Sequence, residues 1–194
     1  MKNVPKASAL TLVAIILLAL SLTSCSSETQ KQAPELVKFF AYDCLPCYQV
    51  EMNQDPALSL KMVHLSFGSP EKQALARLFY SLEVMERVST HHKLAFRDIQ
   101  QQRLIVTDSQ SLMDWIQAVG LDPNAFSQAW SSPLVDQKIK QGEALAAQFN
   151  VRTTPAFLVR NSEVIQYTQD AKTTWDVVNK ALGLSSETEV KNIP

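Results

Sequence analysis

The chain has 194 residues, a formal net charge of −1 and a hydrophobic content of 46%. This length suits one globular domain with room for an insertion, and the composition is too apolar and too weakly charged for a disordered protein. A near-neutral chain lacks the basic surface that nucleic-acid binding requires, so we expect no nucleic-acid partner. The chain has only 4 glycines, and their spacing excludes a glycine-rich phosphate-binding loop.

The first 24 residues have the order of an export signal. Two lysines precede the uncharged, mostly apolar stretch 7–22, and small residues follow it. The sequence Leu-Thr-Ser-Cys at 22–25 resembles the lipobox of bacterial lipoproteins, in which the cysteine receives a lipid and becomes the new N-terminus. The resemblance predicts a signal peptide at 1–24 and lipid attachment at Cys25. A plainly secreted chain and an uncleaved anchor are the alternatives.

Residues 25–34 are polar and end in proline, which is typical of a flexible tether. A chain held by a lipid and such a tether would work outside the cytoplasm and close to a membrane. Disulfides persist in that environment. We therefore expect a periplasmic protein that is anchored to one of the two membranes.

The chain after the tether predicts, in order, a strand, a helix, a strand, a helical block, two strands and a final helix. The stretches 36–42 and 62–67 are apolar and rich in branched or aromatic residues, which indicates strands of a covered sheet. The stretches 156–160 and 163–167 flank a short polar turn and indicate an antiparallel hairpin.

Helices are expected between the second strand and the hairpin, because apolar residues recur there at helical spacing. Ser69 and Pro70 are a typical helix start, with serine as the N-cap and proline in the first helical position. Further helices are expected to end at Gly120, to begin at Pro123 and Pro133, and to run through 173–182.

This order predicts an α/β core that is interrupted by an all-helical insertion. We expect the core domain at 35–68 and 141–185, and the insertion at 69–140. Residues 186–194 are expected to be a C-terminal tail.

The motif Cys44-Leu45-Pro46-Cys47 follows the first strand and opens a helix. Cysteines three residues apart in a first helical turn are neighbours, so their sulfurs can form a disulfide. The free N–H groups and the positive dipole end of the helix stabilise a thiolate, most strongly at Cys44. Thiol–disulfide exchange needs such a thiolate, so the motif predicts a redox-active pair.

A zinc site and an inert structural disulfide are the alternatives for this motif. Structural zinc takes four ligands, usually with a second pair of cysteines or histidines. The remaining candidates are Cys25 in the leader, His64, and the adjacent His91 and His92, so we expect no metal. His64 is expected in the core, and His91 and His92 in a solvated break between helices.

Pro155 stands at the entry to a buried strand, where proline is normally unfavourable. It fits there if the bond between Thr154 and Pro155 is cis and packs against the cysteine pair. The backbone of Thr154 would then be open to pair with an extended substrate. A trans proline on an edge strand is the alternative.

Three segments resemble DsbA-type thiol:disulfide oxidoreductases. They are 39–51 around the cysteine pair, 125–130 in the insertion, and 149–157 around the late proline. The similarity covers nearly all of 35–183, and the combination of C-x-x-C, helical insertion and late proline is more specific than any one of them. It implies a thioredoxin fold with an inserted all-helical domain.

The resemblance implies that Cys44 is the exposed nucleophile, Cys47 the buried resolving partner and Pro155 the cis-proline beside them. Leu45 and Pro46, together with Thr154, would contact the substrate. The protein would need no cofactor besides its disulfide and would oxidise newly exported, reduced proteins. A membrane partner of the DsbB type would reoxidise it, and we expect a monomer.

Several features depart from the family pattern. The dipeptide between the cysteines is Leu-Pro where typical members have Pro-His, which predicts a less oxidising disulfide. Lys38 stands where many members have a buried acid; it would favour the Cys44 thiolate if it faces the site, or else it snorkels from the strand end. Asp43 would oppose ionisation unless it faces solvent. No leading strand is evident, so we expect four strands unless part of 29–34 adds an edge.

The leading interpretation is an exported, lipid-anchored oxidoreductase that introduces disulfides into substrate proteins. A reductase or isomerase with the same chemistry is one alternative, although isomerases of this kind usually carry a dimerisation domain for which this chain has no room. A non-catalytic lipoprotein that binds peptides is the other.

Overall fold

The structure is a computed structural model of the chain, and it describes residues 35–184. The expected signal peptide at 1–24, lipid site at Cys25, tether at 25–34 and tail at 186–194 lie outside the described residues. They therefore stay predictions.

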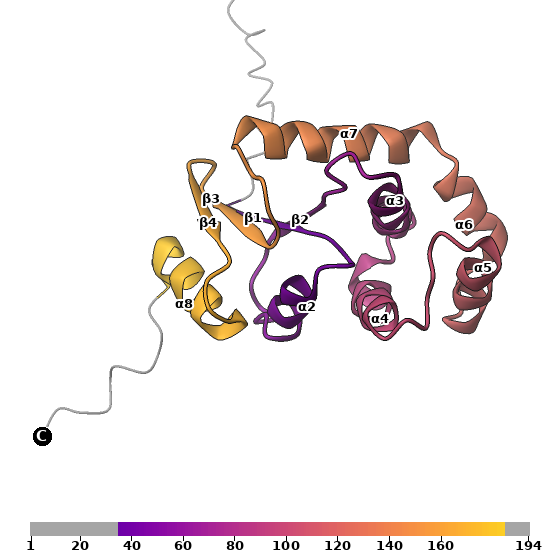
Figure 1. Cartoon of the computed structure of the whole chain (residues 1–194), viewed down its shortest axis with the longest axis horizontal. Helices are drawn as coiled ribbons and strands as arrows, with labels where there is room; N and C mark the ends of the chain where they lie inside the picture. The colour runs from indigo at the N-terminus through magenta and orange to yellow at the C-terminus, as the bar shows by residue number, and fades with distance from the viewer. Residues whose placement is uncertain (1–34, 185–194) are drawn as a thin grey trace, which may run out of the picture. The chain divides into compact units, whose positions relative to one another are not determined.

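The described part alternates strands and helices in the predicted order, with a run of helices in the middle (Figure 1). The strands are β1 (Leu36–Phe40), β2 (Lys61–His64), β3 (Ala156–Val159) and β4 (Glu163–Gln166). The helices are α2 (Leu45–Met52), α3 (Pro70–Val84), α4 (Val88–Gln100), α5 (Ser109–Ala118), α6 (Pro123–Trp130), α7 (Pro133–Gln148) and α8 (Ala171–Leu182).

The four strands form one mixed sheet in the order β2-β1-β3-β4. β1 pairs in parallel with β2, so that Phe40 lies opposite His64, and antiparallel with β3, so that Phe39 lies opposite Ala156. The ends of β1 and β2 and the start of β3 therefore meet at one edge of the sheet. The cysteine motif and the Thr154–Pro155 segment both lie at this edge.

Side chains alternate along each strand, so both faces of the sheet carry apolar residues. Helices cover both of these faces. Val37, Phe39 and Leu158 belong to one apolar cluster, which Ala146 of α7 completes. Residues of the opposite face form a second cluster with α8 and α2; they include Leu36, Phe157, Val159, Val50, Trp175 and Val178. Figure 1 shows α7 on one side of the sheet and α2 and α8 on the other.

The third cluster joins the sheet to the helical insertion, named here for residues 69–140. Phe40 and Tyr42, at the end of β1, are fully buried against Phe79 of α3 and Phe96 of α4. The ring centroids of Phe40 and Phe79 lie 5.0 Å apart in an edge-to-face arrangement, a favoured geometry for aromatic pairs. The residues directly before the cysteine motif are thus held by the insertion.

Side-chain caps explain where several helices begin. The carboxylates of Asp108, Asp122 and Asp170 accept backbone N–H bonds at the starts of α5, α6 and α8, and the Ser132 hydroxyl does so at α7. Ser69 also precedes α3 as predicted, although its hydroxyl makes no cap bond.

Most predicted elements are present, although several of their bounds differ. The fold class, the hairpin and the helix starts at Pro70, Pro123 and Pro133 are confirmed. The first two strands end earlier than expected, at Phe40 and His64. The expected boundary at 140/141 falls inside α7, a single helix that begins in the insertion and ends over the sheet.

The prediction for His92 was wrong. No break separates helices at 91–92; both histidines lie within α4, and the His92 side chain is buried. Its neighbours in the sequence are polar, but the apolar stripe of α4 passes through His92, Ala95 and Phe96 and packs on Phe40.

Among the described helices, none is long and apolar enough to cross a membrane.

Gly142 allows α7 to approach the sheet closely. A Cβ atom at this position would lie 2.6 Å from the Tyr80 hydroxyl oxygen and 3.0 Å from Cγ1 of Val63. The Tyr80 ring cannot easily move, because it is buried and its hydroxyl donates to the carbonyl of His64 at 3.2 Å. Glycine therefore serves close packing here, although it weakens a helix elsewhere.

We expect Gly142→Ala to destabilise the protein by about 1–3 kcal/mol, because the added methyl overpacks the contact with Tyr80. Chemical unfolding measures this directly. Gln141→Ala, at the exposed neighbouring position, is the control and should leave stability unchanged or slightly higher. A Gly142→Ala protein that is more stable than the unsubstituted chain would show that the close approach is absent.

Candidate active site

The cysteine motif begins where β1 ends and α2 starts. Cys44 is the N-cap of α2 in an extended conformation, and its Sγ accepts a hydrogen bond from the backbone N–H of Cys47 at 3.2 Å. Pro46 fits in the first turn because the N–H that it lacks has no helical partner there. A cysteine sulfur thus takes the place that a serine or aspartate oxygen occupies at an ordinary helix start.

Cys44 and Cys47 form a disulfide, with their Cα atoms 5.2 Å apart. The two sulfurs differ in exposure: Cys44 is half-buried, whereas Cys47 is 1% exposed. Of the two, only Cys44 is therefore open to attack from outside. The resemblance to DsbA-type proteins implied such a difference, with Cys44 as the exposed cysteine and Cys47 as the buried one.

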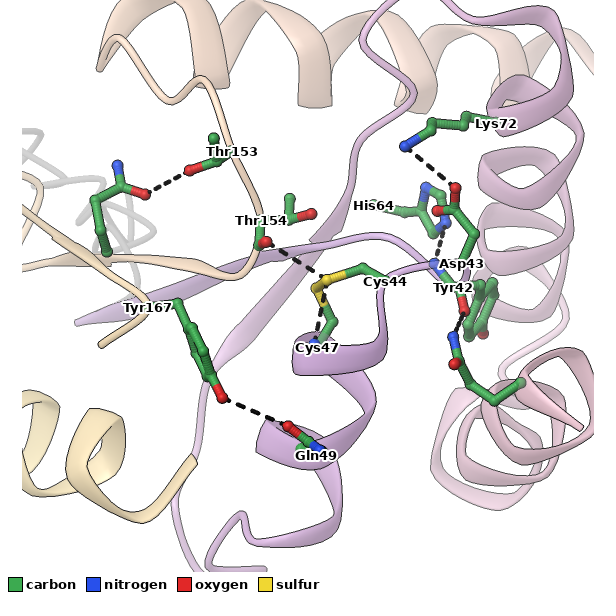
Figure 2. Close-up of a disulfide and its surroundings, with 12 residues drawn as sticks. Tyr42, Asp43, Cys44, Cys47, Gln49, His64, Lys72, Thr153, Thr154 and Tyr167 are labelled. Carbon is green, nitrogen blue, oxygen red and sulfur yellow. Dashed lines mark hydrogen bonds and ion pairs between the residues drawn. A yellow bond between two sulfur atoms is a disulfide. The ribbon is translucent and has the colours of Figure 1, made fainter. Parts of the chain in front are cut away.

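The segment before β3 lies against the outer sulfur. The bond between Thr154 and Pro155 is cis, as expected, and Pro155 is buried. The carbonyl oxygen of Thr154 lies 3.4 Å from the Cys44 sulfur, although the two residues are 110 positions apart in the chain (Figure 2). The structure therefore brings Cys44 and Cys47 together with Thr154 and Pro155.

Polar and apolar groups surround this contact. Leu45 is 55% exposed beside Cys44, and Pro46 is half-buried. On the Thr154 side of the disulfide, the Thr153 hydroxyl donates to Gln166 at 2.9 Å and the Tyr167 hydroxyl donates to Gln49 at 3.4 Å (Figure 2). The outer cysteine thus lies in a surface that has both an exposed aliphatic group and hydrogen-bonding groups.

Asp43 lies on the opposite side of Cys44 from Thr154 (Figure 2). Its carboxylate is part-exposed and forms an ion pair with Lys72 of α3 at 3.1 Å. Asp43 is an exposed residue, so it faces solvent, which the sequence left open, and it contacts Lys72 as well. Its charge is matched by a lysine of the helical insertion.

The family model described as "DSBA-like thioredoxin domain" matches residues 47–182, which is well over half of the chain. The match begins at the inner cysteine of the pair. The chain belongs to this DSBA-like thioredoxin domain family.

Curated relatives and solved structures agree with this assignment. The chain is 26% identical over 132 residues to the thiol:disulfide interchange protein DsbA of Pseudomonas syringae pv. tomato, a match that covers 64% of this chain and 61% of the relative. It therefore spans about three fifths of that relative's length. The structure resembles a variant of Pseudomonas aeruginosa DsbA with a TM-score of 0.70, at 18% identity, covering 80% of this chain and 88% of that one.

A further similar structure is a complex of DsbA from Proteus mirabilis with a non-covalently bound peptide, PWATCDS. Its TM-score is 0.61 at 20% identity, and the match covers 78% of this chain and 90% of that one. At such identities the solved structures establish the DsbA-like fold.

Beneath α2, the helix that begins with the cysteine pair, lies a buried charge cluster. Lys38 of β1 is 1% exposed, and its ammonium group contacts the Glu51 carboxylate of α2 and donates to Gln54 at 2.8 Å. The snorkelling interpretation of Lys38 was therefore wrong. Lys38 does lie under α2, but its charge is directed at Glu51, which is two turns along α2 from Cys44.

Two groups of α4 complete this cluster. Nε2 of His92 lies 3.3 Å from the Glu51 carboxylate, and the Lys93 ammonium lies 3.9 Å from it. Burial alone would raise the pKa of Glu51, but the contacts with His92 and Lys38 lower it from 4.5 to about 2. Burial lowers the pKa of Lys38, while Glu51 opposes that shift. The cluster thus ties β1, α2 and α4 together by charge.

Two buried histidines support the end of β1. Nε2 of His64 accepts the backbone N–H of Tyr42 at 3.0 Å, and Nδ1 of His92 lies 3.0 Å from the Tyr42 hydroxyl. His64 was expected in the core, and the structure confirms this. Burial, reinforced by the charges of His92 and Lys72, lowers the pKa of His64 to about 3.

Within residues 35–184, no three His, Cys, Asp or Glu side chains are grouped to hold a metal ion.

Sequence reasoning missed Glu51, Gln54 and Lys72, and it placed His92 in solvent. The sequence did hold a signal for Glu51. It stands four residues after Cys47, and residues at that spacing share one face of a helix, so Glu51 lies with Cys47 on the buried side of α2. The ion pair between Lys72 and Asp43 has no sequence signal, because it depends on how α3 packs beside the end of β1.

We expect Glu51→Gln to lower the free energy of unfolding by about 3–5 kcal/mol, because it leaves the buried Lys38 ammonium without its counter-charge. Urea unfolding measures the loss. Adding Lys38→Met to this variant should restore much of the stability. Glu83→Gln, which breaks the part-exposed pair with Lys138, is the control and should cost no more than about 1 kcal/mol. Equal losses in the two single variants would contradict the buried-pair account.

Stability should also fall in mild acid because of His64. Its pKa is depressed to about 3 in the folded protein, so below about pH 6.5 the unfolded chain takes up a proton that the folded protein does not. This contribution is complete above about pH 6.5 and declines by up to about 1.4 kcal/mol per pH unit as the pH falls.

His64→Gln, which keeps an acceptor but cannot titrate, tests this. We expect denaturant unfolding of the variant to lose less stability between about pH 6.5 and pH 5 than the unsubstituted chain, by about 2 kcal/mol. An identical decline in both proteins would mean that His64 is protonated in the folded state.

Proposed function

We propose that this chain is an exported thiol:disulfide oxidoreductase that introduces disulfides into substrate proteins through the pair Cys44–Cys47. The observation that carries the proposal is the geometry of the outer sulfur. Cys44 is the half-buried N-cap of α2, accepts an N–H from Cys47, and faces the carbonyl of Thr154. The name of the curated relatives, thiol:disulfide interchange protein, supports the same chemistry.

The reaction follows from the exposure of the two sulfurs. A substrate thiolate attacks Sγ of Cys44, the bond to Sγ of Cys47 breaks, and Cys47 leaves as a thiolate that takes up a proton. A second substrate thiolate then attacks the substrate sulfur of the mixed disulfide and releases Cys44 as a thiolate. The substrate is oxidised by two electrons and the pair is reduced by two. In the reverse direction, Cys47 resolves the mixed disulfide.

The start of α2 favours the second step, in which Cys44 leaves the mixed disulfide as a thiolate. The thiolate released at Cys44 stays bonded to the N–H of Cys47 and lies at the positive end of the α2 dipole. A stabilised leaving group departs faster, and a stabilised thiolate makes the reduced pair more favourable. The disulfide is therefore an oxidant to the extent that this site stabilises negative charge on one sulfur.

We assign substrate contacts to Thr154, Leu45 and Pro46, with Pro155 holding the Thr154 carbonyl at Cys44. Thr154 lies just before the first ladder pair of β3, Ala156 with Gln166. An extended substrate strand could pair with its backbone there. The peptide in the Proteus mirabilis complex supports a peptide ligand for this fold.

Lys38 and Asp43 would tune the pair electrostatically, Lys38 through α2 and Asp43 as a neighbour of the reacting sulfur. The substrates would be reduced, incompletely folded exported proteins, and a DsbB-type membrane protein would reoxidise the pair. We further propose that Cys25 carries a lipid that anchors a periplasmic monomer to a membrane, and that the disulfide is the only redox group.

An oxidative refolding assay tests the function. The oxidised protein should restore activity to reduced ribonuclease, and Cys44→Ala should abolish this, because no sulfur remains for the substrate to attack. Cys47→Ala should accumulate mixed disulfides when offered a peptide disulfide, since the resolving thiol is missing. An oxidised chain that refolds ribonuclease no faster than Cys44→Ala would contradict the proposal and favour a non-catalytic peptide-binding role.

A reductase is the second candidate, because Pro46 stands directly before Cys47 where typical DsbA proteins have histidine. Equilibration of the pair with glutathione distinguishes the two directions. We expect a disulfide that glutathione reduces, but less completely than it reduces the most oxidising members of the family. A pair that stays oxidised at a potential near that of thioredoxin, about −270 mV, would favour the reductase.

A further inference from the structure

We propose that Lys72, which belongs to the helical insertion, is a positioning residue for the redox pair: its ammonium group balances the Asp43 carboxylate and stabilises the negative charge that forms on Cys44 when the disulfide is reduced. The inference rests on the proposed function and adds to it. Under this proposal, a charged residue of the helical insertion influences the ionisation of Cys44.

Asp43 brings a negative charge to the site. It precedes Cys44 directly, and its side chain is 38% exposed. When the disulfide opens, Cys44 becomes a thiolate one residue after this carboxylate, and like charges on adjacent residues oppose each other. Lys72 lies 3.1 Å from Asp43, so the pair is already in place before the second negative charge forms.

No favourable charge interaction within α3 accounts for a lysine at position 72. It is the third residue of α3, in the first turn, where a cation meets the positive end of the helix dipole. Neither Ala76 four residues later nor Leu75 three residues later offers a carboxylate. The carboxylate that Lys72 contacts belongs to Asp43, directly before the cysteine pair, and not to α3.

The start of α3 is fixed in position. The loop between β2 and α3 is held by Glu143 of α7, whose carboxylate accepts the N–H and hydroxyl of Ser66, at 2.6 and 2.8 Å, and the N–H of Phe67 at 3.2 Å. Because β1 and β2 are parallel, this loop emerges at the same edge of the sheet as Cys44. Figure 2 shows Lys72 reaching from α3 to Asp43.

The other charged groups around α2 are buried in ion pairs or lie at the surface on the far side of Thr154. Glu51 on the buried side of α2 contacts Lys38 and His92. Arg152, two residues before Thr154, is exposed and donates to the neutral side chain of Asn150 at 2.8 Å, so it keeps its positive charge. His64 beneath Tyr42 has its pKa lowered to about 3 by burial and neighbouring charges. It is therefore neutral near pH 7. Asp43 and Lys72 are the charged pair on the side of Cys44 that faces α3 (Figure 2).

The redox step conserves atoms and electrons. A substrate dithiol and the Cys44–Cys47 disulfide give a substrate disulfide, a Cys44 thiolate, a Cys47 thiol and one released proton. Two electrons pass from the substrate sulfurs to the protein sulfurs. Lys72 changes no bond in this step. It lowers the free energy of the product in which Cys44 is charged, so its presence makes the disulfide more oxidising.

The test compares Lys72→Gln and Lys72→Arg in the full chain. The Cys44 pKa is read from thiolate absorbance of the reduced protein, and the redox equilibrium is measured against glutathione. Lys72→Gln should raise the pKa of Cys44 and make the disulfide less oxidising by about twofold to fivefold in the equilibrium constant. Lys72→Arg keeps the charge and should stay close to the unsubstituted chain. Both differences should shrink at high salt, because the pair is part-exposed.

The matched control is Lys138→Gln. It breaks the pair between Lys138 and Glu83, which joins α7 to α3 with the same 3.1 Å separation and similar exposure but lies away from the motif. It should leave the Cys44 pKa and the redox equilibrium unchanged. Asp43→Asn should shift both quantities in the direction opposite to Lys72→Gln.

The inference is overturned if Lys72→Gln shifts neither quantity, or shifts them no more than Lys138→Gln does. A loss of unfolding stability in Lys72→Gln without a change at Cys44 would make the pair a purely structural contact, and also overturns it. These outcomes are distinct from a failure of the proposed function, in which the unsubstituted chain itself would not oxidise ribonuclease.

Discussion

One hydrogen bond underlies the chemistry proposed for this protein: the N–H of Cys47 donates to the sulfur of Cys44 at the start of α2. A helix must satisfy its first N–H groups, and here a sulfur atom serves as the cap. The same N–H groups favour a thiolate once the disulfide opens. A requirement of helix formation and a requirement of thiol chemistry are therefore met by the same atoms.

The rest of the fold holds this helix start from several sides. The sheet brings the Thr154 carbonyl to the outer sulfur, and the insertion packs Phe79 and Phe96 against the end of β1. Below the helix, Lys38 and Glu51 join β1 to α2 inside the protein. Buried pairs of this kind contribute little net stability but are costly to break, which fits a role in fixing where the redox helix lies.

Much of this could be predicted from the sequence, for reasons that are local. Cys44, Cys47 and Pro155 stand in short motifs whose meaning depends on neighbours in the chain, and Pro70, Pro123 and Pro133 mark helix starts through their own geometry. His92 could not be placed this way, because its polar neighbours suggest solvent and only the packing of α4 on Phe40 buries it. The contacts of Lys38 and Lys72 could not be predicted either, because their partners lie on other elements and a long side chain can turn to either face.

The central claim is that Cys44 is an unusually acidic thiol, and the rate of its alkylation as a function of pH measures this most directly. In the reduced protein, we predict that the rate reaches half of its plateau well below the value of about 8.5 that is usual for a free cysteine. A midpoint at or above that value would mean that the start of α2 does not stabilise the thiolate, and would contradict the claim.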